Sequence, residues 1–212
     1  VYSLAGRFVK SEDGGATWTR VIPPHDDNHD MWINPDNPDL FIQGNDGGAN
    51  VTHNGGKTWS TPFTQPNQQA YRVNVDDQFP YNLSGSCQDL IGYMVPSASV
   101  WGGIALSEVT VIGSGESGQV IRHPEDPNIV YHLAQSTCAY GGGPSQRVNL
   151  KTGQWEHVNV WPMSTFGRGQ SDAKYRFNWH APIVIDPFDA ETIYTAAEVV
   201  FRSRDRGQSW EV

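Results

Sequence analysis

An eight-residue pattern that occurs three times constrains the fold of this sequence more than any other feature. The pattern is Ser/Thr-x-Asp/Asn-x-Gly-x-Thr/Ser-Trp, and it occupies residues 11–18, 52–59 and 203–210. A short Asp or Asn side chain can accept hydrogen bonds from the backbone N–H groups of a turn, and the glycine allows a positive φ. The final Trp is expected to fill the hydrophobic layer beneath each turn. We therefore assign a structural role to the following residues: Ser11, Asp13, Gly15, Thr17, Trp18, Thr52, Asn54, Gly56, Thr58, Trp59, Ser203, Asp205, Gly207, Ser209 and Trp210.

The stretch from His29 to Trp59 is the most complete unit between two of these turns. It contains three short apolar runs and a closing aromatic run, each bounded by Pro, Gly, Asn or Asp. This is typical of strands joined by turns, and no part of it has the period of a helix. Trp18 and Trp59 are 41 residues apart, a spacing typical of four-stranded propeller blades.

The sequence therefore predicts an all-β protein, a β-propeller of four-stranded blades with about five blades present. The expected blades are residues 1–24 (partial), 28–63, 69–112, 113–161 and 175–212, with a linker at 162–174. The outer strands of the third blade are expected at residues 91–95 and 100–106. Because the partial blade would leave sheet edges open, we expect a fragment of a longer chain whose remaining blades are its partners.

The three Trp-terminated segments resemble the Asp-box, or BNR, repeats of sialidases, of xyloglucan-cleaving propellers and of the VPS10 domain of sortilin. Residues 29–59, 71–89 and 175–210 are most similar to bacterial VPS10/sortilin-like propeller proteins. The resemblance implies an exported protein, periplasmic or extracellular, whose signal peptide is not in this fragment. It does not imply one chemistry, because the propeller fold hosts many.

Composition and charge exclude some partners. The chain has 212 residues, 37% of them hydrophobic, which is enough to bury a core. A formal net charge of −9 disfavours nucleic acid and anionic membranes. No run of 18 apolar residues is present, so we expect no membrane insertion. Cys87 and Cys138 match no zinc or redox spacing, and both a disulfide between them and a pair of buried thiols fit the sequence.

Polar residues at predicted strand ends define a candidate site. In a propeller the entries of the inner strands and the loops between second and third strands lie on one face, near the central channel, and the Trp-terminated turns lie on the opposite face. The candidate catalytic carboxylates on the channel face are Asp30, Asp46, Asp89, Glu116 and Glu198. The candidate ligand-binding residues are His29, Tyr71, Arg72, Gln88, Asn178, Trp179 and His180, and Arg72 and Arg176 would supply counter-charges.

Three functions fit these residues. The first is a binding module that takes a peptide or a glycan at the acidic channel face. The second is a glycoside hydrolase, in which two carboxylates about 5–10 Å apart act as acid and base or as acid and nucleophile. The third is a structural part of a larger scaffold. Carboxylates that accept backbone N–H groups would argue against the enzyme.

We expect no cofactor, although one acidic segment could hold a hard cation. Asp26, Asp27 and Asp30 offer the oxygen ligands that Ca²⁺ prefers. Their spacing does not match an EF-hand loop, so a solvated acidic turn is the favoured interpretation.

Overall fold

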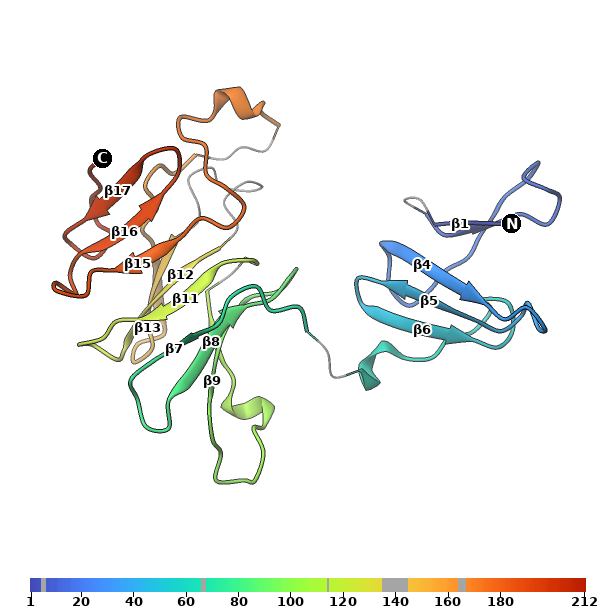
Figure 1. The fold of residues 1–212 in the computed structure, drawn as a ribbon, viewed down its shortest axis with the longest axis horizontal. Coiled ribbons are helices and arrows are strands. Elements are labelled where there is room, and N and C mark those ends of the chain that lie inside the picture. The colour runs from blue at the N-terminus through green and yellow to red at the C-terminus, as the bar shows by residue number, and fades with distance from the viewer. Residues whose placement is uncertain (5–6, 66–67, 114, 135–144, 164–166) are drawn as a thin grey trace. The chain divides into compact units, whose positions relative to one another are not determined.

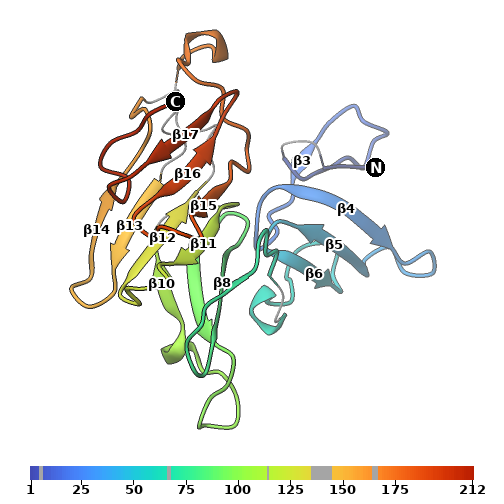
Figure 2. The same ribbon diagram turned by 60° about the vertical axis from the view of Figure 1, so that its left-hand side comes forward.

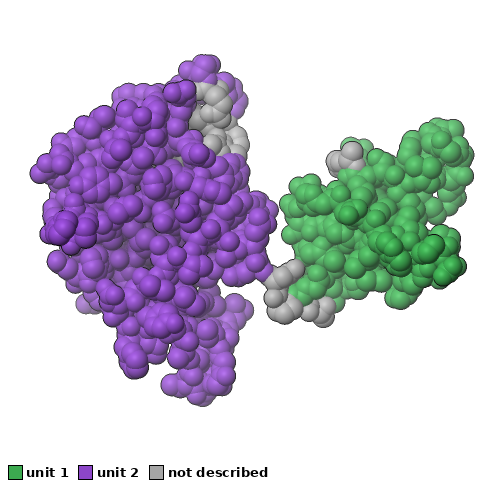
Figure 3. Space-filling model, in the orientation of Figure 1, with its two compact units in different colours: residues 1–67 green, residues 68–212 purple. Residues whose placement is uncertain are grey.

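The computed structural model describes residues 1–4, 7–65, 68–113, 115–134, 145–163 and 167–212. The chain divides into two compact units, residues 1–67 and 68–212 (Figure 3). Apart from three short 3₁₀ helices, the regular structure of the described residues consists of antiparallel strands in five sheets, which confirms the all-β prediction. No helix in the described ranges is long and apolar enough to cross a membrane.

Unit 1 contains two three-stranded sheets (Figure 1). The first is formed by β1 (Tyr2–Ser3), β2 (Val9–Lys10) and β3 (Thr19–Arg20), and the second by β4 (Asn28–Ile33), β5 (Phe41–Asn45) and β6 (Gly48–Thr52), followed by η1 (Pro62–Thr64). An aromatic core joins them, because Phe41 is fully buried and its ring centroid lies 6.3 Å from that of Phe8 and 5.4 Å from that of Trp59.

Unit 2 contains three sheets, each of which follows the chain order from one strand to the next. The first sheet has β7 (Asn74–Val75), β8 (Asn82–Ser86), β9 (Gly92–Pro96) and β10 (Thr110–Ile112), with η2 (Leu106–Glu108) before β10. The second has β11 (Gln119–Arg122), β12 (Ile129–Leu133), β13 (Ser145–Asn149) and β14 (Gln154–His157), followed by η3 (Gln170–Asp172). The third has β15 (Ile183–Ile185), β16 (Ile193–Ala196) and β17 (Val200–Ser203).

The second sheet of unit 2 is packed on both faces (Figures 1 and 2). Ile129, Tyr131 and Leu133 of β12 join a hydrophobic cluster with the third sheet. Val130, which points to the opposite face because side chains alternate along a strand, packs with Met94 of the first sheet. All five residues of β12 are therefore buried. Face-to-face stacking of chain-ordered antiparallel sheets is the arrangement expected of propeller blades.

One strand prediction requires correction. Residues 100–106 were expected to form a strand, but the fourth strand of that sheet is β10, at Thr110–Ile112. This apolar segment is a loop, because the side chains of Val100, Trp101 and Leu106 are exposed and Gly102 has a φ of +80°. Within the described residues, the sheets of β1–β3, β4–β6 and β15–β17 each have three strands, and an isolated antiparallel bridge pairs Arg202 of β17 with Glu211.

All three Trp-terminated turns form the same local hydrogen bonds. In the third, Ser203 Oγ donates to Asp205 Oδ1 at 2.7 Å, and the same oxygen accepts the N–H of Ser209 at 2.8 Å. The turns at residues 11–18 and 52–59 repeat this pattern with Asp13 and Asn54 as acceptors. The expected hydrogen bonds from the turn backbone to the Asp or Asn side chain are thus present in all three turns.

The tryptophans of these turns are not equally buried. Trp59 packs in the unit 1 core, and Trp210 Nε1 donates to the carbonyl of Val158 at 3.0 Å. Each therefore contacts the sheet that precedes its own. Trp18 is 46% exposed, which contradicts the expected burial, because no sheet precedes its own among the described residues.

We predict that Asp205 stabilises its turn mainly because its side-chain oxygens accept hydrogen bonds. Asp205→Ala should lower the Tm of the protein, whereas Asp205→Asn should largely retain it, because Asn54 fills the same position in the second turn. The hydrogen bonds from Ser209 and Ser203 lower the pKa of Asp205 to about 2. Its stabilising effect is therefore complete above the ordinary carboxyl pKa and is lost as the pH falls towards 2. Melting curves of both variants at pH 7 and pH 3 test this; equal Tm values for Ala and Asn at pH 7 would contradict it.

Candidate functional site

Five of the predicted site residues form one continuous chain of contacts in unit 2. Tyr71 and Gln88 are diagonal neighbours on either side of the Ala70–Cys87 bridge, because the N–H of Tyr71 donates to Ser86 O and the N–H of Gln88 donates to Gln69 O. The Tyr71 hydroxyl donates to Gln88 Oε1, and the His180 ring packs edge-on against the Tyr71 ring with centroids 4.6 Å apart.

The same chain continues to a pair of carboxyl groups. Gln88 Nε2 donates to Asp89 Oδ1 at 3.0 Å, and the N–H of Asp89 donates to Glu116 Oε2 at 2.5 Å. Asp89 and Ser117 both adopt positive φ, 56° and 63°, a conformation that is uncommon outside glycine. We name the set Tyr71, Gln88, Asp89, Glu116 and His180 the carboxyl-pair network.

Burial sets the protonation of Glu116. Its side chain is 6% exposed, and this burial raises its pKa, with the negative charge of Asp89 acting in the same direction. The hydrogen bond from the Asp89 N–H opposes the rise but is the smaller effect. Glu116 therefore keeps its proton to a higher pH than an ordinary glutamate does.

A groove of about 430 Å³ lies beside this network. We name it the strand-end groove, and it is lined by Arg176, Asn178, His180, Pro182, Ala196, Ala197 and Glu198. Glu198, in the turn between β16 and β17, accepts the N–H of Arg176 at 2.7 Å. That hydrogen bond, together with the nearby guanidinium charge, lowers the pKa of Glu198. Glu198 is therefore a fixed negative charge at neutral pH.

The remaining predicted residues of unit 2 stand apart from these contacts. Arg72 is exposed and Trp179 is partly buried, and neither belongs to the carboxyl-pair network or to the lining of the groove. Cys87 is a buried free cysteine, and burial raises its pKa. Cys138, the other half of the disulfide that the sequence allowed, lies outside the described residues.

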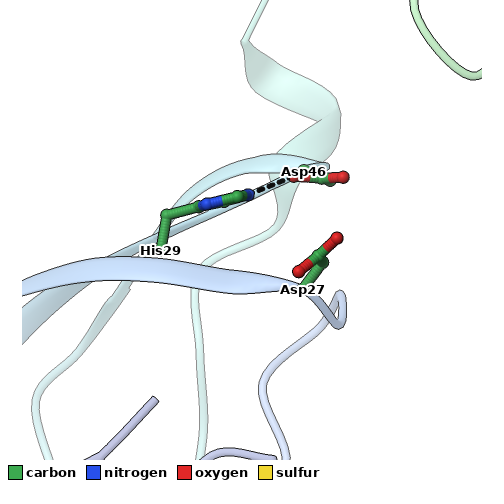
Figure 4. Close-up of side chains that lie close together, drawn as sticks. All are labelled: Asp27, His29 and Asp46. Atoms are coloured by element: carbon green, nitrogen blue, oxygen red, sulfur yellow. Dashed lines mark hydrogen bonds and ion pairs between the residues drawn. The ribbon is translucent and has the colours of Figure 1, made fainter. Parts of the chain in front are cut away.

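Unit 1 contains the other predicted carboxylates. His29 Nε2 and Asp46 Oδ1 are 2.5 Å apart, and Asp27 lies beside them, with one ligand atom of each residue within 4.8 Å of the others (Figure 4). The hydrogen bond that the His29 ring donates to Asp46 raises the pKa of His29. Asp30 is not part of this trio, since its carboxylate accepts the N–H of Met31 at 2.8 Å.

The trio differs from the cation site that the sequence offered, which used Asp26, Asp27 and Asp30. Asp27 lies just before β4 with a φ of +56°, and its carboxylate lies beside the His29 ring. Asp46 joins them because Asn28 pairs with Asn45 across β4 and β5. One imidazole and two carboxylates form a donor set better suited to a transition metal than to Ca²⁺. All three side chains are exposed, and such groups are common without an ion.

Comparison with known proteins finds no matching family model and no matching curated protein. Similar solved structures include a GH74 xyloglucanase from Xanthomonas campestris, 14% identical over 99% of this chain and 36% of that chain, with a TM-score of 0.40. A GH74 enzyme from Niastella koreensis is 19% identical over 98% of this chain and 34% of that chain, with a TM-score of 0.40. YCF48 from Cyanidioschyzon merolae is 16% identical over 97% and 63% of the two chains, with a TM-score of 0.41.

The chain thus spans about a third of the length of these two GH74 enzymes. With TM-scores of 0.40 and 0.41 and identities of 14–19%, these likenesses carry no argument about the function of this chain. They add no support for the narrower resemblance to VPS10/sortilin-like or BNR-repeat proteins.

Proposed function

We propose that this protein is an exported ligand-binding module and that the strand-end groove takes a short peptide segment that carries a carboxylate. The observation that supports this most is the guanidinium of Arg176. It lines the groove, and no hydrogen bond or ion pair of its side chain is found within the described part of the chain. A guanidinium whose N–H groups are not used in hydrogen bonds can hold a carboxylate with two parallel hydrogen bonds.

The second charge of the groove favours a peptide over a neutral glycan. Glu198 is fixed by the backbone at Arg176 and stays ionised at neutral pH. A groove that offers both signs of charge suits a peptide, which carries both signs itself and whose backbone donates and accepts hydrogen bonds. The volume of about 430 Å³ is within the range of sites for small ligands.

The contacts of the carboxylates favour binding over hydrolysis. Asp30, Glu116 and Glu198 each accept a backbone N–H, and Asp46 is paired with His29. Glycoside hydrolysis remains the second candidate because burial raises the pKa of Glu116 beside Asp89, which is the direction that a general acid requires. The contact between the two residues, however, is a hydrogen bond from the backbone N–H of Asp89 to Glu116 Oε2, and a carboxylate that accepts a backbone N–H argues against the enzyme.

We expect Arg176→Gln to weaken peptide binding at least tenfold, because a charge-assisted hydrogen bond contributes roughly 1.5–3 kcal/mol. Arg72→Gln is the matched control, since Arg72 is an exposed arginine of the same unit outside the groove. Calorimetric titration would use a mixed library of short peptides with free C-termini, the same library amidated, and neutral and uronate-containing oligosaccharides.

Three outcomes would overturn the peptide proposal. Equal affinity of Arg176→Gln and Arg72→Gln would place binding elsewhere. Tight binding of the uronate oligosaccharides alone would make the ligand a glycan. New reducing ends in the oligosaccharide samples, lost in Glu116→Gln, would make the protein a hydrolase.

A further inference from the structure

A second groove, of about 390 Å³, lies between the second and third sheets of unit 2. Two Arg–Glu pairs line it, so we name it the two-arginine groove. Arg147 of β13 donates to Glu156 of β14 at 2.8 Å, and Arg206 binds Glu191 through Nε, 2.8 Å from each carboxylate oxygen. No residue of this groove is among those that the sequence analysis selected for function.

Local structure explains why these side chains meet. Tyr131, Arg147 and Glu156 are direct cross-strand neighbours on β12, β13 and β14, so they share one face of the sheet. Arg206 follows β17 in the third Trp-terminated turn, and its carbonyl accepts a hydrogen bond from Arg147 Nη1 at 3.0 Å. The groove is therefore built on strands and on a braced turn.

Two fully buried side chains next to the groove have polar atoms without a partner. His123 Nδ1 accepts the N–H groups of Glu125 and Asp126 at 3.2 and 3.0 Å, which leaves the ring proton on Nε2. Nε2 has no hydrogen-bond partner, and Glu191 Oε1, an oxygen of the groove, is 3.9 Å away. The Tyr131 hydroxyl is also buried and unpartnered.

These orphan groups point to a ligand. A buried polar group without a partner destabilises the folded state, so most such groups in native proteins are satisfied by protein, water or ligand. Arg147, Arg206 and Glu191, which line the groove, are the charges that act on the Tyr131 hydroxyl. Glu191 and Arg206 have side chains 48% and 30% exposed, so a ligand can displace them and reach the groups beneath.

The charges of the groove define the ligand class. Each arginine is already neutralised by a glutamate, which disfavours a free anion and a free cation alike. What the groove offers is a dense set of donors and acceptors, extended by the amides of Asn149 and Gln154, beside the apolar Ile129. A sugar ring matches this, because its hydroxyls both donate and accept and its C–H face is apolar. We propose that the two-arginine groove is a second ligand site that binds a pyranose ring of a neutral glycan.

The test uses Tyr131→Phe, which removes one oxygen and conserves the ring. NMR titration of the full chain with neutral tetrasaccharides of glucose, mannose and galactose should shift signals of β13 and β14. Tyr131→Phe should weaken that binding at least tenfold without lowering Tm, because the hydroxyl has no partner to lose. The matched control is Tyr194→Phe, which loses a 3.0 Å hydrogen bond to Asp186 and should lower Tm without changing affinity.

The site is independent of the strand-end groove, so Arg176→Gln should leave sugar binding unchanged whether or not peptides bind. The inference is overturned if no neutral tetrasaccharide shifts the signals of β13 and β14 at millimolar concentration. Equal sugar affinity of wild type and Tyr131→Phe would also overturn it, as would a loss of Tm in Tyr131→Phe equal to that in Tyr194→Phe.

Discussion

Gly118→Ala is expected to lower the free energy of unfolding of unit 2 by more than about 4 kcal/mol. Losses of this size occur when a substitution disrupts the packing of the core or the backbone within it. A Cβ at this position would lie 1.2 Å from the carbonyl oxygen of Leu133 and 2.3 Å from its carbon. Both are backbone atoms, so no side-chain rotation relieves the overlap. The carbonyl of Gly118 also accepts a hydrogen bond from Ser86 Oγ at 2.8 Å. Moving the chain at this point therefore disrupts both the start of β11 and its attachment to β8.

The matched control is Gly103→Ala. A Cβ at Gly103 meets nothing within 4 Å, and its φ is not in the left-handed region, so the change should fall within about 1 kcal/mol of wild type and could be stabilising. Urea unfolding followed by tryptophan fluorescence measures both variants. If Gly118→Ala unfolds within 1 kcal/mol of Gly103→Ala, the tight approach of β11 to β12 described here is wrong.

Features that depend on neighbouring residues could be predicted from the sequence. The Trp-terminated turns are held by contacts four or fewer residues apart, such as the 2.8 Å bond from the Ser209 N–H to Asp205, so the local pattern is sufficient. The burial of β12 has a similarly local signal, because Ile129-Val130-Tyr131 is a continuous apolar run of the kind that strands covered on both faces have. The all-β class follows from such elements.

The pairings within the candidate site could not be predicted in the same way. The sequence selected Tyr71, Gln88, Asp89, Glu116 and His180 as residues of one face, but Asp89 and Glu116 are 27 positions apart. Whether Asp89 and Glu116 touch depends on how two sheets stack, and the hydrophobic pattern of the sequence carries no information about that stacking. The expected roles of these residues in catalysis or binding stay predictions.

The two-arginine groove was missed because its key residue lies in a turn that was read as purely structural. Arg206 has a φ of +57° and occupies the position that Gly14 and Gly55 hold in the other two turns. An arginine at a position where the other two turns have glycine indicates that its side chain has a role of its own. In this turn the Arg206 side chain forms ion pairs with Glu191 and Asp126. Comparing the three turns residue by residue would have shown it.

His132 should make the protein sensitive to mild acid. Its side chain is fully buried, both ring nitrogens lack a hydrogen-bond partner, and burial lowers its pKa to about 4. The ordinary value of about 6.5 applies in the unfolded chain, so between pH 6.5 and pH 4 the unfolded state binds the proton and the folded state does not. The stability that depends on neutral His132 is therefore complete above pH 6.5 and decreases by about 1.4 kcal/mol per pH unit below it, to a total of about 3 kcal/mol near pH 4.

His132→Leu isolates this effect from the other groups that titrate in the same range. Glu116, whose pKa is raised by burial, gains stability as the pH falls, whereas His123, whose pKa is lowered by burial, acts in the same direction as His132. Both are present in wild type and variant, so the difference between the two unfolding curves belongs to residue 132.

We expect the free energy of unfolding of wild type, measured in urea from pH 7.5 to pH 4.5, to fall about 2–3 kcal/mol further than that of His132→Leu. The exposed His53 provides the control, since His53→Gln should follow the wild-type curve. Parallel curves for wild type and His132→Leu would mean that His132 finds a partner or water in solution, and that the packing between the first and second sheets of unit 2 is looser than described.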